Sequence, residues 1–155
     1  MNTTPGAAAT ENEALAVVKR YFGGCETGDV ETIASTLDPD VIHYFLPADR
    51  PPIRGAEHLA RFWGKMKRAN QAHWGVDHAI CVGDEVVVEW TLYWTHPGRG
   101  LRLVNRGTDW YIVQHGKIQE IRAYLYFPAA QPLIESDSEL NGFPYKDRGY
   151  LVEDV

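Results

Sequence analysis

Apolar residues recur every three or four positions in two segments of the chain, a spacing that predicts two amphipathic helices. The first set is Ala14, Val17, Val18, Tyr21 and Cys25, and the second is Leu59, Phe62, Trp63 and Met66. The segment Thr10-Glu11-Asn12-Glu13 has the form of a capping box, so the first helix is expected to begin near Glu11. Gly28 can end it in a left-handed conformation, and Asp29 can cap a short second helix that runs to about Thr36.

The rest of the pattern is mostly extended. Residues 41–46 are a short β-branched and aromatic run, which predicts a strand, and the proline-containing stretch 47–54 predicts a loop. Four longer strands are predicted at 73–82, 85–96, 101–114 and 117–127, separated by hairpin turns that contain glycine. Helices followed by a meander of antiparallel strands predict an α+β domain, with the N-terminal helices packed on one face of a curved antiparallel sheet.

The composition restricts the function of this domain. A chain of 155 residues that is 45% apolar can fold around one core, and a net charge of −6 without a basic stripe argues against nucleic acid or an anionic membrane as a partner. No apolar run approaches the roughly 20 residues of a membrane helix, and residues 1–10 lack the apolar core of a signal peptide. Cys25 and Cys81 are predicted to be free thiols. These features predict a cytoplasmic protein.

Asp109 is the first candidate for chemistry, because it lies within the aromatic strand segment 105–113 and burial of an unpaired carboxylate is costly. Two positions of its side chain are open at this point. It can face the interior, where burial would raise its pKa, or it can face water on the outer side of a half-exposed strand. An ion pair with Arg106 on the same strand would instead lower the pKa of Asp109.

Several segments together resemble the nuclear transport factor 2-like superfamily, and within it the ketosteroid isomerase and SnoaL-like polyketide cyclase group. The matching segments are Arg20-Tyr21, Thr27-Gly28-Asp29, Pro51 to Gly55, Ala60 to Trp63, Gly107-Thr108-Asp109, Gly116-Lys117-Ile118 and Ala123-Tyr124. The resemblance spans about residues 15–127. It implies a cone-shaped α+β fold with a pocket between the sheet and the helices, and chemistry without a cofactor.

The resemblance also implies roles for two acids. Tyr21 falls where ketosteroid isomerases place an oxyanion-hole tyrosine, and Asp109 falls where they place its protonated aspartic acid partner. A phenol and a neutral carboxylic acid in an apolar site can both donate hydrogen bonds to an enolate-like oxygen. Tyr21 is equally compatible with an ordinary aromatic residue in the core of a helix.

The chain departs from the isomerases at the catalytic base. Where they carry an aspartate, this sequence has His43-Tyr44-Phe45, and by position Tyr44 replaces the base. Strand alternation lets only one of His43 and Tyr44 face the pocket. His73 is the expected base, because related scytalone dehydratase-like members place a catalytic histidine there, with Glu26 as its orienting acid. The open alternative is that His73 and Glu26 are solvated residues at a strand start and a helix end.

The expected function is that of a cofactor-independent enzyme that acts on a small apolar carbonyl or hydroxyl compound, polyketide- or steroid-like, by general acid/base proton transfer with enolate stabilisation. Isomerase, cyclase and dehydratase reactions all fit this description. The substrate-binding residues are expected to be Tyr44, Trp63, Trp90, Tyr111, Ala123 and Leu125. The sequence has no H-E-x-x-H motif or Cys/His cluster, so no metal site is expected. The alternative is a non-catalytic small-molecule binding or protein-interaction domain of the same fold.

Three segments are expected along the chain. Residues 1–10 would be a flexible N-terminus, residues 11–127 the cone domain, and residues 128–155 a C-terminal extension. The extension carries several large apolar side chains, among them Leu133, Leu140, Phe143, Tyr145 and Tyr150. It is therefore expected to pack on its own domain or on a dimer partner rather than to form a linker.

The outer face of the strand at 85–96 predicts an assembly. Val87, Thr91 and Tyr93 share this face with Glu85 and Glu89, and such a mixed surface suits a two-fold interface. We predict a homodimer. Light scattering at micromolar concentration should give twice the mass of one chain, and a monomer mass would contradict the prediction.

Overall fold

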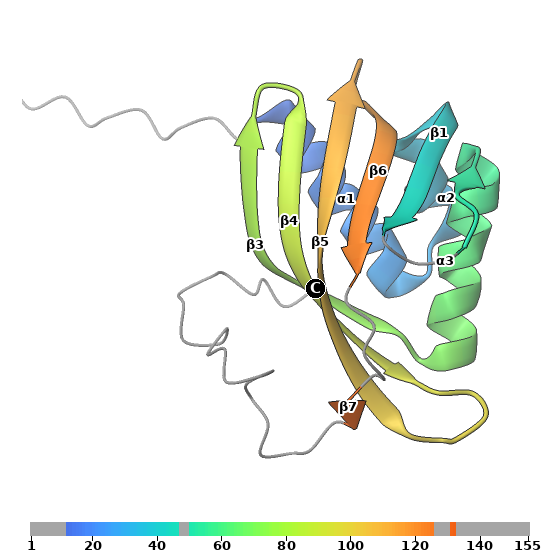
Figure 1. The fold of residues 1–155 in the computed structure, drawn as a ribbon. Helices are drawn as coiled ribbons and strands as arrows, with labels where there is room; N and C mark the ends of the chain where they lie inside the picture. The colour runs from blue at the N-terminus through green and yellow to red at the C-terminus, as the bar shows by residue number, and fades with distance from the viewer. Residues whose placement is uncertain (1–11, 47–49, 126–130, 133–155) are drawn as a thin grey trace, which may run out of the picture.

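The computed structural model describes residues 12–46, 50–125 and 131–132, and these form an α+β fold in which three helices cover one face of a curved sheet (Figure 1). The helices are α1 (Glu13–Thr27), α2 (Val30–Ser35) and α3 (Ala56–Asn70). The strands are β1 (Leu37–Leu46), β2 (Ile53–Arg54), β3 (His73–Val82), β4 (Glu85–Thr95), β5 (Arg102–Gln114), β6 (Lys117–Leu125) and β7 (Gln131–Pro132). Their order in the sheet is β2-β1-β6-β5-β4-β3, and β7 pairs with β5 outside this path.

The ends of the helices follow from local capping. Asn12 caps α1, because its side-chain oxygen accepts a hydrogen bond of 2.8 Å from the Ala14 amide, so α1 begins later than the capping-box interpretation predicted. Gly28 ends α1 in the left-handed conformation at φ 73°, as predicted. Asp29 caps α2 through two backbone amides, each 3.1 Å away, which is also as predicted.

The sheet is mixed rather than entirely antiparallel. Strands β3 to β6 form the predicted antiparallel meander, but β1 runs parallel to β6, with His43 opposite Ile121. Strand β1 also begins at Leu37, before the predicted start, and its register shifts between Leu37 and Ile42. Pro39 lies within this irregular stretch, where a residue without an N–H is tolerated.

The core lies between the helices and the inner face of the sheet. Its largest fully buried side chains include Tyr111, Ile33, Leu59, Ile118 and Ile121. On the inner face of β4, Val88 and Trp90 are both almost completely buried. Because Asp109 pairs with Val88 across the antiparallel ladder, its side chain lies on the same inner face.

The outer face differs from the expected open interface at one position. Thr91 is buried, and its hydroxyl donates a hydrogen bond of 2.6 Å to Asp77, so it does not contribute an open surface. The expected flexible N-terminus at 1–10 and most of the extension at 128–155 lie outside the described residues. The homodimer stays a prediction.

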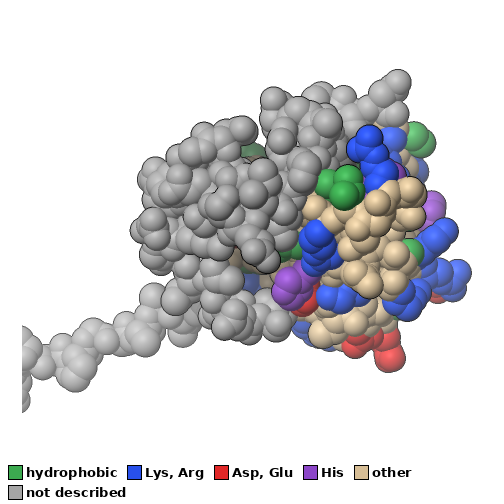
Figure 2. Space-filling view, turned by 90° about the horizontal axis from the view of Figure 1, so that it is seen from below, with side chains coloured by type: hydrophobic (Ala, Val, Ile, Leu, Met, Phe, Trp, Pro, Cys, Tyr) green, Lys and Arg blue, Asp and Glu red, His purple; other side chains and the backbone are tan. Residues whose placement is uncertain are grey.

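The charge on the surface and the length of the helices can be compared with the partners that the composition argued against, which are nucleic acid and membranes. In Figure 2 the Lys and Arg side chains on the described part of the face form separate small groups rather than a continuous basic surface. Within the residues that the structure describes, no helix is long and apolar enough to cross a membrane.

Candidate active site

A cavity of about 220 Å³ lies between the helices and the inner face of the sheet. Aromatic side chains make up half of the residues that line it. Six of the predicted site residues lie in this lining, namely Tyr21, Trp63, Trp90, Asp109, Tyr111 and Ala123. The side chain of Leu125 lies outside the described part of the structure. A pocket with mostly apolar walls and few polar groups is the usual form of a small-molecule site.

Asp109 is a buried carboxyl group that is held by two neutral donors. The Trp90 indole N–H donates to Oδ1 at 2.8 Å, and the Tyr111 hydroxyl donates to Oδ2 at 2.9 Å. Burial raises the pKa of Asp109 to about 6, while the two hydrogen bonds act in the opposite direction. The interior position is therefore the observed one, and the water-facing alternative is wrong. At neutral pH the carboxylate form predominates, which suits a proton acceptor better than a donor.

Gly107 makes the contact between Trp90 and Asp109 possible. Residues 90 and 107 are paired across β4 and β5, and the Trp90 ring lies directly over the glycine. A Cβ atom at position 107 would lie only 2.3 Å from Cζ2 of the Trp90 ring. The Gly107-Thr108-Asp109 segment thus combines the carboxylate with the space that its indole partner needs.

Arg106 does not form the predicted alternative pair with Asp109. Its guanidinium forms an ion pair with Asp77, with Nη2 2.8 Å from Oδ2, and its Nε donates to the Thr91 hydroxyl at 3.2 Å. The causes that shift the pKa of Asp109 are burial, Trp90 and Tyr111. Asp109 is therefore held by neutral groups in an apolar pocket.

Tyr21 contributes a second acidic group to the same pocket. Its side chain is 3% exposed, and its hydroxyl has no hydrogen-bond partner among the described residues. Burial raises the pKa of Tyr21 well above its ordinary value, and the nearby Cys25 and Asp109 add to the rise. The hydroxyl is consequently a neutral donor that is available to a ligand.

His43, rather than Tyr44, faces the pocket, so the prediction for Tyr44 is wrong. Val41, His43 and Phe45 are buried in β1, whereas Tyr44 on the opposite face is only partly buried and is not part of the lining. The cause is the pairing of β1 with β6, which places His43 beside the buried Ile121. Strand alternation then turns Tyr44 away.

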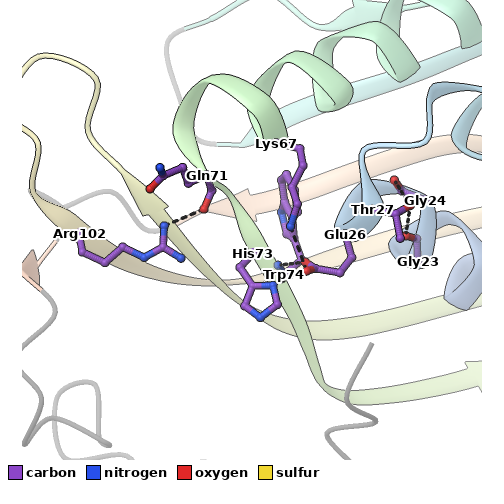
Figure 3. A network of polar contacts seen from close by, with 9 residues as sticks. All are labelled: Gly23, Gly24, Glu26, Thr27, Lys67, Gln71, His73, Trp74 and Arg102. Atoms are coloured by element: carbon purple, nitrogen blue, oxygen red, sulfur yellow. Dashed lines mark hydrogen bonds and ion pairs between the residues drawn. The ribbon is translucent and has the colours of Figure 1, made fainter.

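His73 and Glu26 form the predicted pair, but they do so outside the cavity lining. Figure 3 shows Lys67 from α3 and His73 from β3 meeting at the Glu26 carboxylate of α1. Oε1 of Glu26 contacts the His73 ring and lies 3.0 Å from Lys67 Nζ, and Oε2 accepts from the Trp74 amide at 2.7 Å. The His73 side chain is 56% exposed and is not part of the lining. This cluster joins three elements, and the role of His73 as base has no support from its position.

Sequence reasoning missed several residues of the site. Trp74, Trp94, Asn105 and Arg50 also line the cavity, and the Trp94 indole donates to Asn105 at 2.5 Å. Trp94 lines the cavity from the same strand as Trp90. Its position on the strand that carries Trp90 was the available signal. Within the described part of the chain, no group of three or more His, Cys, Asp or Glu residues could hold a metal ion.

The fold defines a class of protein, namely the α+β cone of the nuclear transport factor 2-like superfamily. Solved structures with this architecture include a protein of unknown function with a cystatin-like fold from Methylobium petroleophilum, which is 25% identical over 93% of this chain and 94% of its own, with a TM-score of 0.66. A proposed polyketide cyclase from Xanthomonas campestris is 22% identical over 74% of this chain and 90% of its own, with a TM-score of 0.62. A proposed ketosteroid isomerase from Kribbella flavida is 20% identical over 80% and 85%, with a TM-score of 0.63.

The family follows from the sequence itself. Residues 18–121 match the model of the SnoaL-like domain, and the chain belongs to this family. No curated protein gives a significant match. The resemblance drawn from the motifs is thereby confirmed for the family and for the fold.

We predict that Gly107→Ala raises the pKa of Asp109. The added methyl group must displace the Trp90 ring, which removes a hydrogen bond that favours the carboxylate, and overpacking should also cost about 1–3 kcal/mol of stability. Carbon-detected NMR titration of the Asp109 carboxyl should give a midpoint near 6 in the wild type and a higher midpoint in the variant. Gly75→Ala is the matched control, since a Cβ there meets no atom within 4 Å. An unchanged midpoint in Gly107→Ala would contradict the account.

We predict that the Glu26 cluster contributes to stability and not to the pocket chemistry. Glu26→Ala leaves the buried Trp74 amide without its acceptor and should lower the free energy of unfolding by about 1–3 kcal/mol. Glu57→Ala removes the exposed pair with Arg61 and should change stability little. Urea denaturation measures both, and equal effects of the two substitutions would refute a special role for Glu26.

Proposed function

We propose that the protein is a cofactor-independent enzyme that moves a proton on a small, largely apolar carbonyl or hydroxyl compound. The observation that carries this proposal is the Asp109 carboxyl, which is held among aromatic rings with a pKa of about 6, near a Tyr21 hydroxyl that has no hydrogen bond of ordinary length among the described residues. Membership of the SnoaL-like family supports small-molecule conversion in general. The proposal assigns the proton transfer to individual residues of this chain.

Asp109 would act as the general base. Its carboxylate takes a proton from the carbon next to a substrate carbonyl, and the electron pair of the broken C–H bond moves to the carbonyl oxygen to give an enolate. The protonated Asp109 can then return the proton to another position. A pKa close to the working pH lets one group serve in both directions. This assignment replaces His73, which lies outside the lining of the cavity.

Tyr21 would stabilise the enolate oxygen. Its buried hydroxyl stays protonated, because burial raises its pKa, and it can donate a hydrogen bond as negative charge develops. Asp109 in its carboxylate form cannot donate such a bond. The two groups therefore divide the roles of base and oxyanion donor, instead of sharing the oxyanion role that the resemblance implied.

The pocket walls indicate the kind of substrate. Trp63, Trp90 and Tyr111 present apolar ring surface, and the cavity is small. A compound with one or more flat carbon rings fits such walls, which agrees with a polyketide- or steroid-like substrate. Isomerisation, dehydration and cyclisation all begin with the same proton abstraction.

We predict that the protein catalyses exchange of the α-hydrogens of 2-tetralone, a small bicyclic ketone, in deuterated buffer above the rate of the buffer alone. The rate should rise as the pH rises through about 6 and then level off, because only the Asp109 carboxylate accepts a proton. Mass spectrometry follows the incorporated deuterium. Asp109→Asn should lower the rate about 100-fold or more, as the loss of a general base does.

Two further variants test the assignment of roles. Tyr21→Phe should lower the rate about 100-fold, the usual effect of one lost oxyanion donor, without moving the pH midpoint. His73→Gln should leave the rate unchanged, since His73 lies outside the cavity lining. If Asp109→Asn exchanges as fast as the wild type, the proposal fails. If 2-tetralone binds but is never exchanged, the chain is a binding domain of the same fold.

A further inference from the structure

His43 is a buried histidine that the proton-transfer scheme does not use. Its side chain is 1% exposed and lines the cavity, and neither ring nitrogen has a hydrogen-bond partner among the described residues. Its nearest ring neighbours are aromatic, with the Phe45 centroid at 4.4 Å and the Trp63 centroid at 5.5 Å. A phenylalanine at this position would fill similar space without burying two polar atoms.

Trp63 is a second side chain that buries a polar atom at this corner of the cavity. Its indole Nε1 is buried and makes no hydrogen bond of ordinary length among the described residues, although it lies near enough to the Tyr21 hydroxyl to lower the pKa of that group. Its ring meets the His43 ring edge to face. Buried polar groups in proteins nearly always have partners, because leaving one unpaired costs free energy. Two unpaired side chains next to each other in one cavity indicate that something polar occupies this corner when the site is filled.

Burial and charge fix the form of the His43 ring. Burial, assisted by the nearby Arg50 guanidinium, lowers the pKa of His43 to about 3. Arg50 lies over the Phe45 ring, 4.3 Å from its centroid, and also lines the cavity. A neutral imidazole always carries one N–H donor and one bare nitrogen acceptor. The corner therefore offers one acceptor from His43 and donors from both His43 and Trp63.

We propose that His43 and Trp63 form a second subsite that binds a hydroxyl group of the substrate, next to the place where the Tyr21 hydroxyl would bind the enolate oxygen. The inference rests on the proposed function only in that the same cavity receives the substrate. A hydroxyl group can donate to the bare nitrogen of His43 and accept from the Trp63 indole, and the N–H on the other side of the imidazole is left to a different acceptor. A carbonyl or carboxylate oxygen only accepts and would leave the bare nitrogen unpaired.

The subsite gives the proposed substrate a more definite form. It would be a ring compound with two oxygen functions, one that becomes the enolate oxygen and one hydroxyl that fixes the orientation of the rings. His43 is then a specificity-determining residue. A site that hydrogen-bonds a hydroxyl group discriminates strongly against the analogue that lacks it, because its own polar atoms are otherwise left unpaired.

A pair of probes tests the subsite directly. The dissociation constants of 2-tetralone and of its 6-hydroxy and 7-hydroxy derivatives are measured by quenching of tryptophan fluorescence. The wild type should bind at least one hydroxylated probe about 5- to 30-fold more tightly than 2-tetralone, the gain from one or two net hydrogen bonds. His43→Phe and Trp63→Phe should each reduce this preference, measured as the ratio of the dissociation constants of the two probes for the same variant. The His43 ring nitrogen signals in the NMR spectrum should move with the hydroxylated probe only.

Tyr44→Phe is the control variant. It removes the hydroxyl of the neighbouring residue, which faces away from the cavity, and the variant should still bind the hydroxylated probe more tightly than 2-tetralone. His43→Phe replaces an unpaired polar ring with an apolar one, so its melting temperature should not fall, and Trp63→Phe tests the same subsite independently. Equal binding of the probes by the wild type, no binding of any probe, or a preference that survives both substitutions overturns the inference. Preferential binding without hydrogen exchange keeps the subsite and removes only the proposed acid/base function.

Discussion

The hydrogen bond from the Trp90 indole to Asp109 is the interaction on which the candidate site depends. It holds a carboxylate within walls of aromatic rings, and Gly107 leaves the space that it needs. The bond from Tyr111 completes the support. Because both donors are neutral, they orient the carboxylate without balancing its charge, and its pKa stays above the ordinary range. A cation in place of either donor would favour the ionised form and weaken the group as a base.

Local patterns allowed much of the fold to be predicted. The helical spacing of Leu59, Phe62, Trp63 and Met66 gave α3, and alternation with hairpin turns gave the bounds of β3 to β6 within a few residues. These features depend on neighbours in the sequence. The parallel pairing of β1 with β6 depends on two segments far apart in the chain, and no local pattern specifies it.

The candidate site, like the fold, could be predicted only in part. The family resemblance placed Asp109 and Tyr21 in the pocket, whereas the residues alone left Asp109 with an interior and a water-facing position. His43 was not chosen, because the positional match to the isomerases favoured Tyr44, and only the register against β6 decides which face of β1 is buried. The contact between Glu26 and His73 was anticipated, but the direction of the histidine was not, since a strand start specifies position and not the side to which a side chain turns.

The way β1 joins the sheet has a consequence for how the pocket is assembled during folding. Trp90, Asp109 and Tyr111 lie on strands joined by hairpins. Contacts between such strands join residues that are near each other in the sequence, so forming them early costs little chain entropy. His43 joins the cavity wall only when β1 pairs with β6, which is far from it in the sequence. This pairing is a contact of high contact order. The half of the cavity that carries Asp109 can therefore form first, and the half that carries His43 is completed last. Local opening that detached β1 would expose the cavity from the His43 side while the Asp109 carboxylate kept its partners.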